Sequence, residues 1–204
     1  MTRYPVHSID TAPEGSREAL EGLRRAVGSI PNLAGAMASA PGLLKGFLAL
    51  RELYYGQGTL GALEIQVLSL TNAYENGCRY CMALHSAWAD REGLSEDSLA
   101  ALREGRSPVE PRLAALSAFS RALVRNRGRV EERERRAFAE AGYTDEQALE
   151  VVLGVAVSVL PNFTHHLTGA PLDDVFRAWA WSPPGVEPDA VAGAQEMAVG
   201  SGPR

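Results

Sequence analysis

One short motif contains both cysteines of this sequence and constrains how the chain can fold around them. Cys78 and Cys81 stand three positions apart, and His85 follows four positions after the second cysteine. At about 100° per residue, a helix places these three positions within about 60° of one another. The Asn-Gly pair at residues 76–77 is a break signal, so we expect Cys78 in the first turn of a new helix. Two thiols and an imidazole then share one helical face.

This position favours redox chemistry over the other uses of a cysteine pair. Unpaired N–H groups and the positive end of the helix dipole stabilise a thiolate there. One helical turn also brings two cysteines close enough to form a disulfide. A purely structural disulfide is a weaker interpretation, because so short a loop removes little entropy from the unfolded chain. We interpret Cys78 and Cys81 as a reversible dithiol centre at a helix N-terminus.

A zinc site is the main alternative to the dithiol centre. Cys78, Cys81 and His85 offer three ligands, and one of the adjacent histidines His165 and His166 could supply the fourth. Histidine pairs are more often satisfied core or interface residues than ligands. The motif alone therefore leaves open a zinc-stabilised structural protein.

The motif and its surroundings resemble a known family. Residues 60–102, with the run ENGCRYCMALHS inside them, resemble the AhpD-like alkylhydroperoxidase branch of the carboxymuconolactone decarboxylase family. The resemblance is most specific at the CxxC-x3-H core and extends more loosely over about residues 20–180. It implies an all-helical fold, assembly into dimers, trimers or hexamers, and reduction of peroxides. It also implies that Cys81 attacks the peroxide, that Cys78 resolves the product, and that His85 assists deprotonation.

One position departs from the family pattern. The family's proton-relay glutamate lies twelve residues before the first cysteine, where this chain has Gln66. An amide can donate and accept hydrogen bonds, but it cannot take up a proton at neutral pH. Glu64 on the same expected helix and Glu75 just before the Asn-Gly pair are the other candidate relay carboxylates. The relay is therefore shorter than in the family or takes another route.

Together the motif and the resemblance predict an antioxidant oxidoreductase, a thiol-dependent peroxidase with a Cys78/Cys81 dithiol–disulfide cycle assisted by His85. Its partners are a hydroperoxide substrate and an external dithiol or thioredoxin-like reductant, with no bound cofactor or metal. The alternative is a general thiol–disulfide oxidoreductase or redox sensor without efficient peroxide turnover, because Gln66 weakens the relay. Decarboxylase members of the superfamily lack the CxxC, which argues against decarboxylation here.

Composition indicates the number of domains, the binding partners to expect and the cellular compartment. A length of 204 residues with 46% hydrophobic and 22% charged residues fits one globular domain. A net charge of −5 gives no reason to expect binding to nucleic acid or to an anionic membrane. No apolar run approaches the roughly 20 residues that span a bilayer, and the first residues lack the apolar stretch of a secretion signal. A reducible cysteine pair fits the cytoplasm, where we place the protein.

Helical periodicity runs through most of the chain without strand alternation, so we predict an all-α, AhpD-like helical bundle. We expect an irregular lead at residues 1–13, a helical domain at 14–182 and a loose tail at 183–204, with a short turn near 190–197.

Two stretches of expected helix are apolar on all sides. They are residues 62–74 and residues 151–160, the second half of a helix expected at 145–160 that Pro161 interrupts. So much apolar surface exceeds what one small bundle can cover. We therefore expect a homo-oligomer.

Overall fold

The computed structural model describes residues 4–185, and helices make up most of this range. No strand occurs among the described residues, so the all-α prediction is confirmed. The expected tail from residue 186 on, including the turn near 190–197, lies outside the described residues. The helices are α1 (Glu14–Val27), α2 (Asn32–Met37), α3 (Pro41–Gly56), α4 (Ala62–Glu75), α5 (Arg79–Arg91), α6 (Glu96–Arg103), α7 (Pro111–Arg125), α8 (Glu132–Glu140), α9 (Asp145–Thr168) and the 3-10 helix η1 (Asp174–Trp179).

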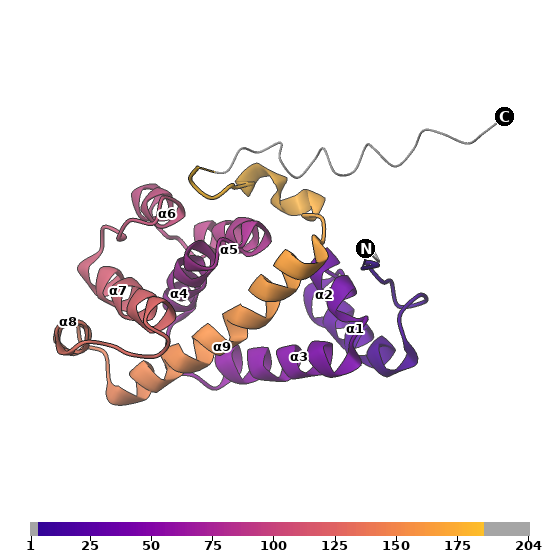
Figure 1. Cartoon of the computed structure of the whole chain (residues 1–204), viewed down its shortest axis with the longest axis horizontal. Coiled ribbons are helices and arrows are strands. Elements are labelled where there is room, and N and C mark those ends of the chain that lie inside the picture. The colour runs from indigo at the N-terminus through magenta and orange to yellow at the C-terminus, as the bar shows by residue number, and fades with distance from the viewer. Residues whose placement is uncertain (1–3, 186–204) are drawn as a thin grey trace.

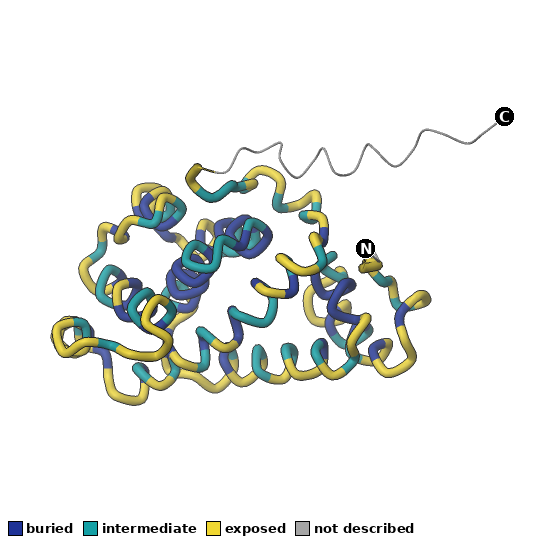
Figure 2. Tube along the Cα trace, in the orientation of Figure 1, coloured by how far each residue is buried: buried dark blue, intermediate teal, exposed yellow. Residues whose placement is uncertain are grey.

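Helix α4 forms the centre of the bundle. It contacts α5, α6, α7 and α9, and every residue from Ile65 to Ala73 is buried. In Figure 1, α6, α7 and α8 lie on one side of the α4–α5 pair, and α1, α2 and α3 lie on the other. Figure 2 shows the buried residues concentrated on α4 and α5. The motif helix is thus fixed against the most buried helix of the protein, which limits how far its thiols can move.

Helix α9 runs unbroken from Asp145 to Thr168, so the expected interruption at Pro161 is wrong. A proline inside a helix lacks one N–H donor and costs about 3 kcal/mol or more. The helix is nevertheless fixed at both ends, by a capping box of Thr144 and Gln147 and by Gly169 in the left-handed region at φ 62°. Packing of α9 on α2 and α3 and polar contacts beyond the proline offset the local cost.

The full length of α9 changes the expectation that no apolar segment is long enough to span a bilayer. With 24 residues it is long and apolar enough, by length and composition alone, to cross a membrane. A helix that ends at residue 160, as expected from the sequence, is too short to meet this criterion. A core helix passes the same test, and α9 contacts five other helices, namely α2, α3, α4, α5 and α7. This packing accounts for the buried part of α9, which is 39% of its most apolar 18-residue window, and large apolar residues also occupy its exposed face.

The crossing of α9 over α3 and α4 is close. A Cβ atom at Gly154 would lie 2.6 Å from the Tyr54 hydroxyl and 2.8 Å from a methyl group of Leu68. Glycine is thus required at this crossing, because it lets the backbone of α9 approach both helices. The approach brings the second half of α9 over the loop that precedes the cysteine motif.

Candidate dithiol site

The cysteine motif begins at a sharp turn between α4 and α5. Gly77 has φ +63°, a left-handed conformation that favours glycine, and the Cys78 N–H donates to the Ala73 carbonyl at 2.8 Å. Cys78 is the N-cap of α5, one position before the first helical turn. Its sulfur accepts the backbone N–H of Cys81 at 3.4 Å. The helix start therefore solvates the Cys78 sulfur directly.

Both cysteines are free thiols and both are buried, with exposed fractions of 0% for Cys78 and 4% for Cys81. Burial raises the pKa of Cys78, but hydrogen bonding to Cys81 and the nearby His165 imidazole outweigh it and lower this pKa to about 5. The hydrogen bond to Cys78 raises the pKa of Cys81 well above its ordinary value, and burial adds to the effect. At neutral pH the negative charge therefore rests on Cys78, while Cys81 keeps its proton.

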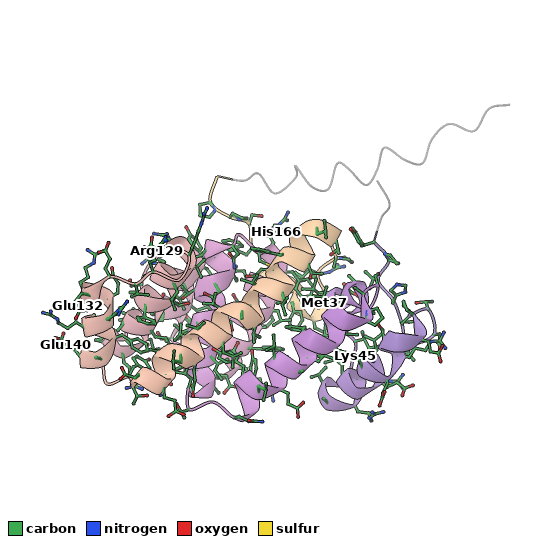
Figure 3. The ribbon with its side chains drawn as sticks, turned by 60° about the horizontal axis from the view of Figure 1, so that its bottom comes forward. Met37, Lys45, Arg129, Glu132, Glu140 and His166 are labelled. Atoms are coloured by element: carbon green, nitrogen blue, oxygen red, sulfur yellow. The ribbon has the colours of Figure 1, made fainter. Side chains whose placement is uncertain are left out.

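Cys81 also lies in the wall of a cavity of about 100 Å³, whose lining does not include Cys78. Residues from α1, α2, α3, α4, α5 and α9 surround this cavity. Most of them are apolar, such as Phe47 and Trp88. Figure 3 labels Met37, another lining residue, on α2. The two thiols thus differ in access as well as in charge, because only Cys81 meets a molecule in the cavity.

His85 lies in the same cavity wall and is paired with Gln66. Its Nδ1 is 2.9 Å from the Gln66 Oε1. Burial, with a smaller contribution from the charge of Arg51, lowers the pKa of His85 to about 3, so the ring is neutral at pH 7. Because Oε1 can only accept, Nδ1 carries the hydrogen and Nε2 is left as an acceptor. His85 can therefore receive a proton but cannot stabilise a thiolate by its own charge.

The other two relay candidates are engaged away from the cavity. Glu64 pairs with Arg112 at 3.0 Å, while its second oxygen accepts a backbone N–H at the start of α4. Glu75 pairs with Arg125 of α7 at 2.6 Å. Neither carboxylate lines the cavity. Of the three candidates, only Gln66 contacts the motif histidine.

The second half of α9 contributes residues that sequence reasoning did not place at the thiols. Asn162 accepts the Asn76 side-chain amide at 2.8 Å, and Nε2 of His166 lies 2.7 Å from the Asn76 carbonyl oxygen. His166 is labelled near the end of α9 in Figure 3. No hydrogen bond of ordinary length satisfies the buried Nδ1 of His165, yet its imidazole lies close enough to Cys78 to lower the thiol's pKa. From the sequence, the functional role considered for His165 is that of a metal ligand, and not that of a neighbour of Cys78.

The arrangement does not resemble a zinc site. Among residues 4–185, no group of three or more histidine, cysteine, aspartate or glutamate side chains is placed to hold a metal ion. His85 faces Gln66, and His166 faces a backbone carbonyl. In the described residues, Cys78, Cys81, His85 and the two histidines of α9 therefore do not form the ligand set that the zinc alternative requires.

Sequence comparison identifies the region that contains the site. The pattern of the Carboxymuconolactone decarboxylase family matches residues 41–122, from the start of α3 into α7. Over these residues the chain is similar to the carboxymuconolactone decarboxylase family. They include both cysteines, His85 and Gln66, and the resemblance found in the sequence is confirmed. No curated protein matches the chain.

Solved structures show the same fold. One is an uncharacterised peroxidase-related protein from Ralstonia eutropha JMP134 with an alkylhydroperoxidase AhpD core, which is 25% identical with a TM-score of 0.73. The match covers 85% of this chain and 93% of that one. A peroxidase-related protein from Silicibacter sp. TM1040 is 18% identical with a TM-score of 0.71, over 86% of this chain and 92% of that one. The AhpD-like helical fold is thereby confirmed.

A third similar structure is a debrominase. A cysteine-to-alanine variant of Bmp8 in complex with 2,3,4-tribromopyrrole has a TM-score of 0.72 at 18% identity. The match covers 87% of this chain and 95% of that chain. Structures with this fold thus include a debrominase as well as peroxidase-related proteins, so the fold alone does not select the reaction.

The unequal thiols give a direct spectroscopic prediction. In the reduced protein we expect one thiolate, seen by its ultraviolet absorbance, that forms as pH rises through about 5. Cys78→Ser should remove this transition. His165→Gln should raise the midpoint of the thiolate transition by about one pH unit or more, because the imidazole that stabilises the charged form of Cys78 is lost. His166→Gln is the matched control on the same helical turn and should leave the midpoint in place. A transition that persists in Cys78→Ser would assign the charge to Cys81 instead.

Proposed function

We propose that this protein is a thiol-dependent peroxidase that reduces hydroperoxides through a Cys78/Cys81 dithiol–disulfide cycle. One observation carries the proposal. The thiol that faces the cavity is Cys81, and the ionised thiol directly behind it is Cys78. This pairing supplies a nucleophile in contact with substrate, a base for its proton and a resolving sulfur. The AhpD-like core of the Ralstonia eutropha structure supports the same reaction class.

The first step oxidises Cys81. A hydroperoxide enters the cavity, and the Cys81 thiol passes its proton to the Cys78 thiolate across their shared hydrogen bond. The new Cys81 thiolate attacks the outer peroxide oxygen, the O–O bond breaks, and the sulfur becomes a sulfenic acid. The alkoxide departs as an alcohol with the hydroperoxide proton, which His85 relays to it, and the Cys78 thiol gives its own proton to the oxygen left on Cys81. Cys78 is then a thiolate again.

The second step forms the disulfide. The Cys78 thiolate attacks the Cys81 sulfur, the S–S bond forms, and hydroxide leaves and is protonated to water. Two thiols and one hydroperoxide thus give one disulfide, one alcohol and one water. An external dithiol or thioredoxin-like protein must then reopen the disulfide by thiol–disulfide exchange. This demand fits a cytoplasmic setting, where such reductants maintain thiols.

His85 assists by holding a proton near the peroxide. Its Nδ1–H donates to Gln66, so its Nε2 can accept the hydroperoxide hydrogen and return it to the leaving oxygen. Gln66 thereby acts by orienting the ring and not by taking a proton itself. In this scheme the Cys78 thiolate performs the deprotonation that the family pattern assigns to a glutamate relay.

A second candidate reaction is the reductive removal of bromine from a small aromatic compound. The apolar, aromatic-walled cavity next to Cys81 favours it, and the similar Bmp8 structure is a debrominase. Here Cys81 takes the halogen, the ring carbon gains a proton, and Cys78 displaces halide to give the same disulfide. Halide release from 2,3,4-tribromopyrrole in the presence of a dithiol tests this reaction.

Turnover tests the peroxidase proposal. With dithiothreitol as the donor and cumene hydroperoxide in large molar excess, the wild-type protein should consume peroxide continuously. Cys81→Ser should reduce consumption to the uncatalysed rate, and His85→Gln should slow it by about a hundred-fold or more, the low end of a proton-transfer contribution. Oxidation of one equivalent followed by arrest would instead identify a redox sensor or a thiol–disulfide oxidoreductase.

We also propose that the outer face of α9 joins copies of this chain into a homo-oligomer. Leu149, Val152, Phe163 and Leu167 are 72%, 51%, 57% and 69% exposed. At about 100° per residue they fall within about 60° of one another, so they form one apolar stripe along the helix. A stripe of this length is typical of a buried interface.

Sedimentation tests the oligomer. The wild-type protein should sediment as a dimer or a larger assembly at micromolar concentration, and Phe163→Asp should shift it towards the monomer. Val175→Asp is the control, because Val175 is equally exposed, at 73%, but lies on η1 away from the stripe. A wild-type protein that sediments as a stable monomer would contradict the proposal.

A further inference from the structure

One arginine, Arg51, lines the cavity next to Cys81. Arg51 lies on α3 and lines the cavity together with Cys81 and His85. Its guanidinium carbon is 4.9 Å from the ring centre of Tyr55 and 5.9 Å from that of Trp88. Two aromatic faces thus hold the charged group in place.

No acidic side chain in the described part of the chain neutralises this cation. The ion pairs formed by residues 4–185 do not include Arg51, although several other arginines have carboxylate partners. The neighbouring Glu52 makes no pair with it, and Glu92, which lines an adjacent hollow with Arg51, makes none either. The nearby His85 is neutral. A half-buried guanidinium without a carboxylate is therefore available to a ligand.

The rest of the cavity offers little else to a polar molecule. Apolar side chains form most of its wall, with Cys81, Ser69, Ser158 and Asn162 among the few polar ones. A guanidinium is planar and matches a carboxylate with two parallel hydrogen bonds, which makes it the most specific anchor in the cavity. Because Arg51 and Cys81 line the same cavity, one small molecule can touch both.

We propose that the physiological substrate is a compact apolar hydroperoxide that carries a carboxylate, bound with the carboxylate on Arg51 and the peroxide at Cys81. This assignment rests on the proposed peroxidase function and names its substrate class. The size of the cavity limits the buried part of the molecule. An engineered apolar cavity of about 150 Å³ binds benzene, so about 100 Å³ accepts a short branched chain, with the remainder towards solvent.

Matched substrates test the anchor. The probes are tertiary hydroperoxides that carry a terminal carboxylate on an alkyl chain of increasing length, each compared with its own methyl ester. For the best-fitting chain length, the wild-type kcat/KM for the acid should exceed that for the ester by about ten- to a hundred-fold, as expected for a charge-assisted pair. The preference should reside mainly in KM, because the carboxylate does not take part in the chemistry.

Variants separate the anchor from general charge effects. Arg51→Met keeps the apolar length of the side chain and should bring the acid-to-ester ratio to about one, while Arg51→Lys should keep part of it. Arg91→Met is the control, because Arg91 lines the adjacent hollow and not the cavity of Cys81, and it should leave the ratio unchanged.

The outcomes distinguish this inference from the function on which it rests. Equal turnover of acids and esters by the wild-type protein would overturn the role of Arg51 and leave the peroxidase intact. If acids and esters are turned over equally and Arg51→Met also loses the oligomer, Arg51 serves a contact between copies of the chain and not substrate binding. If no hydroperoxide turns over, the peroxidase fails. Calorimetry with the matching peroxide-free carboxylic acids then tests the anchor alone, and binding that is lost in Arg51→Met would support it.

Discussion

Cys78 and Cys81 share a buried hydrogen bond, and the surrounding structure determines which sulfur carries the charge. Burying a thiolate is costly unless several groups compensate for lost water. Cys78 has such groups in the helix start, the Cys81 thiol and the His165 imidazole, whereas Cys81 lies beside an apolar cavity. The charge therefore stays behind the cavity, and the face that meets substrate remains neutral.

Under the proposed function, this separation lets an apolar cavity host a reaction that needs an anionic nucleophile. In the proposed reaction the charge moves to Cys81 only when its proton crosses to Cys78, along the hydrogen bond between the two side chains. His85 is neutral for the same reason, since burial opposes its protonation. With Gln66 in place of a carboxylate, no anion lies beside the ring. Arg51 is then the fixed charge in the cavity wall, which makes it the natural anchor for an anionic substrate.

The sequence predicted the features that depend on local spacing. The helical fold, the turn at Gly77 and the polar position of Gln66 on the helix before the motif all follow from short-range patterns. Which thiol is more acidic did not follow, because the answer depends on His165, which lies far along the chain on α9. Because a helix break was expected at Pro161, no local pattern placed His165 on the same helix as residues 145–160. The contacts of α9 with the rest of the bundle outweigh the local cost of the proline. Arg51 was missed because nothing local links it to Cys81.

Chemical trapping of the first oxidised thiol tests the division of roles most directly. One equivalent of hydroperoxide is mixed with each reduced single-serine variant in the presence of a sulfenic-acid trap, and the modified residue is located by mass spectrometry. We expect an adduct on Cys81 in Cys78→Ser, formed more slowly than the wild-type protein oxidises because its base is lost, and no adduct in Cys81→Ser. An adduct on Cys78 in Cys81→Ser, with none on Cys81 in the other variant, would show that the ionised thiol attacks the peroxide itself.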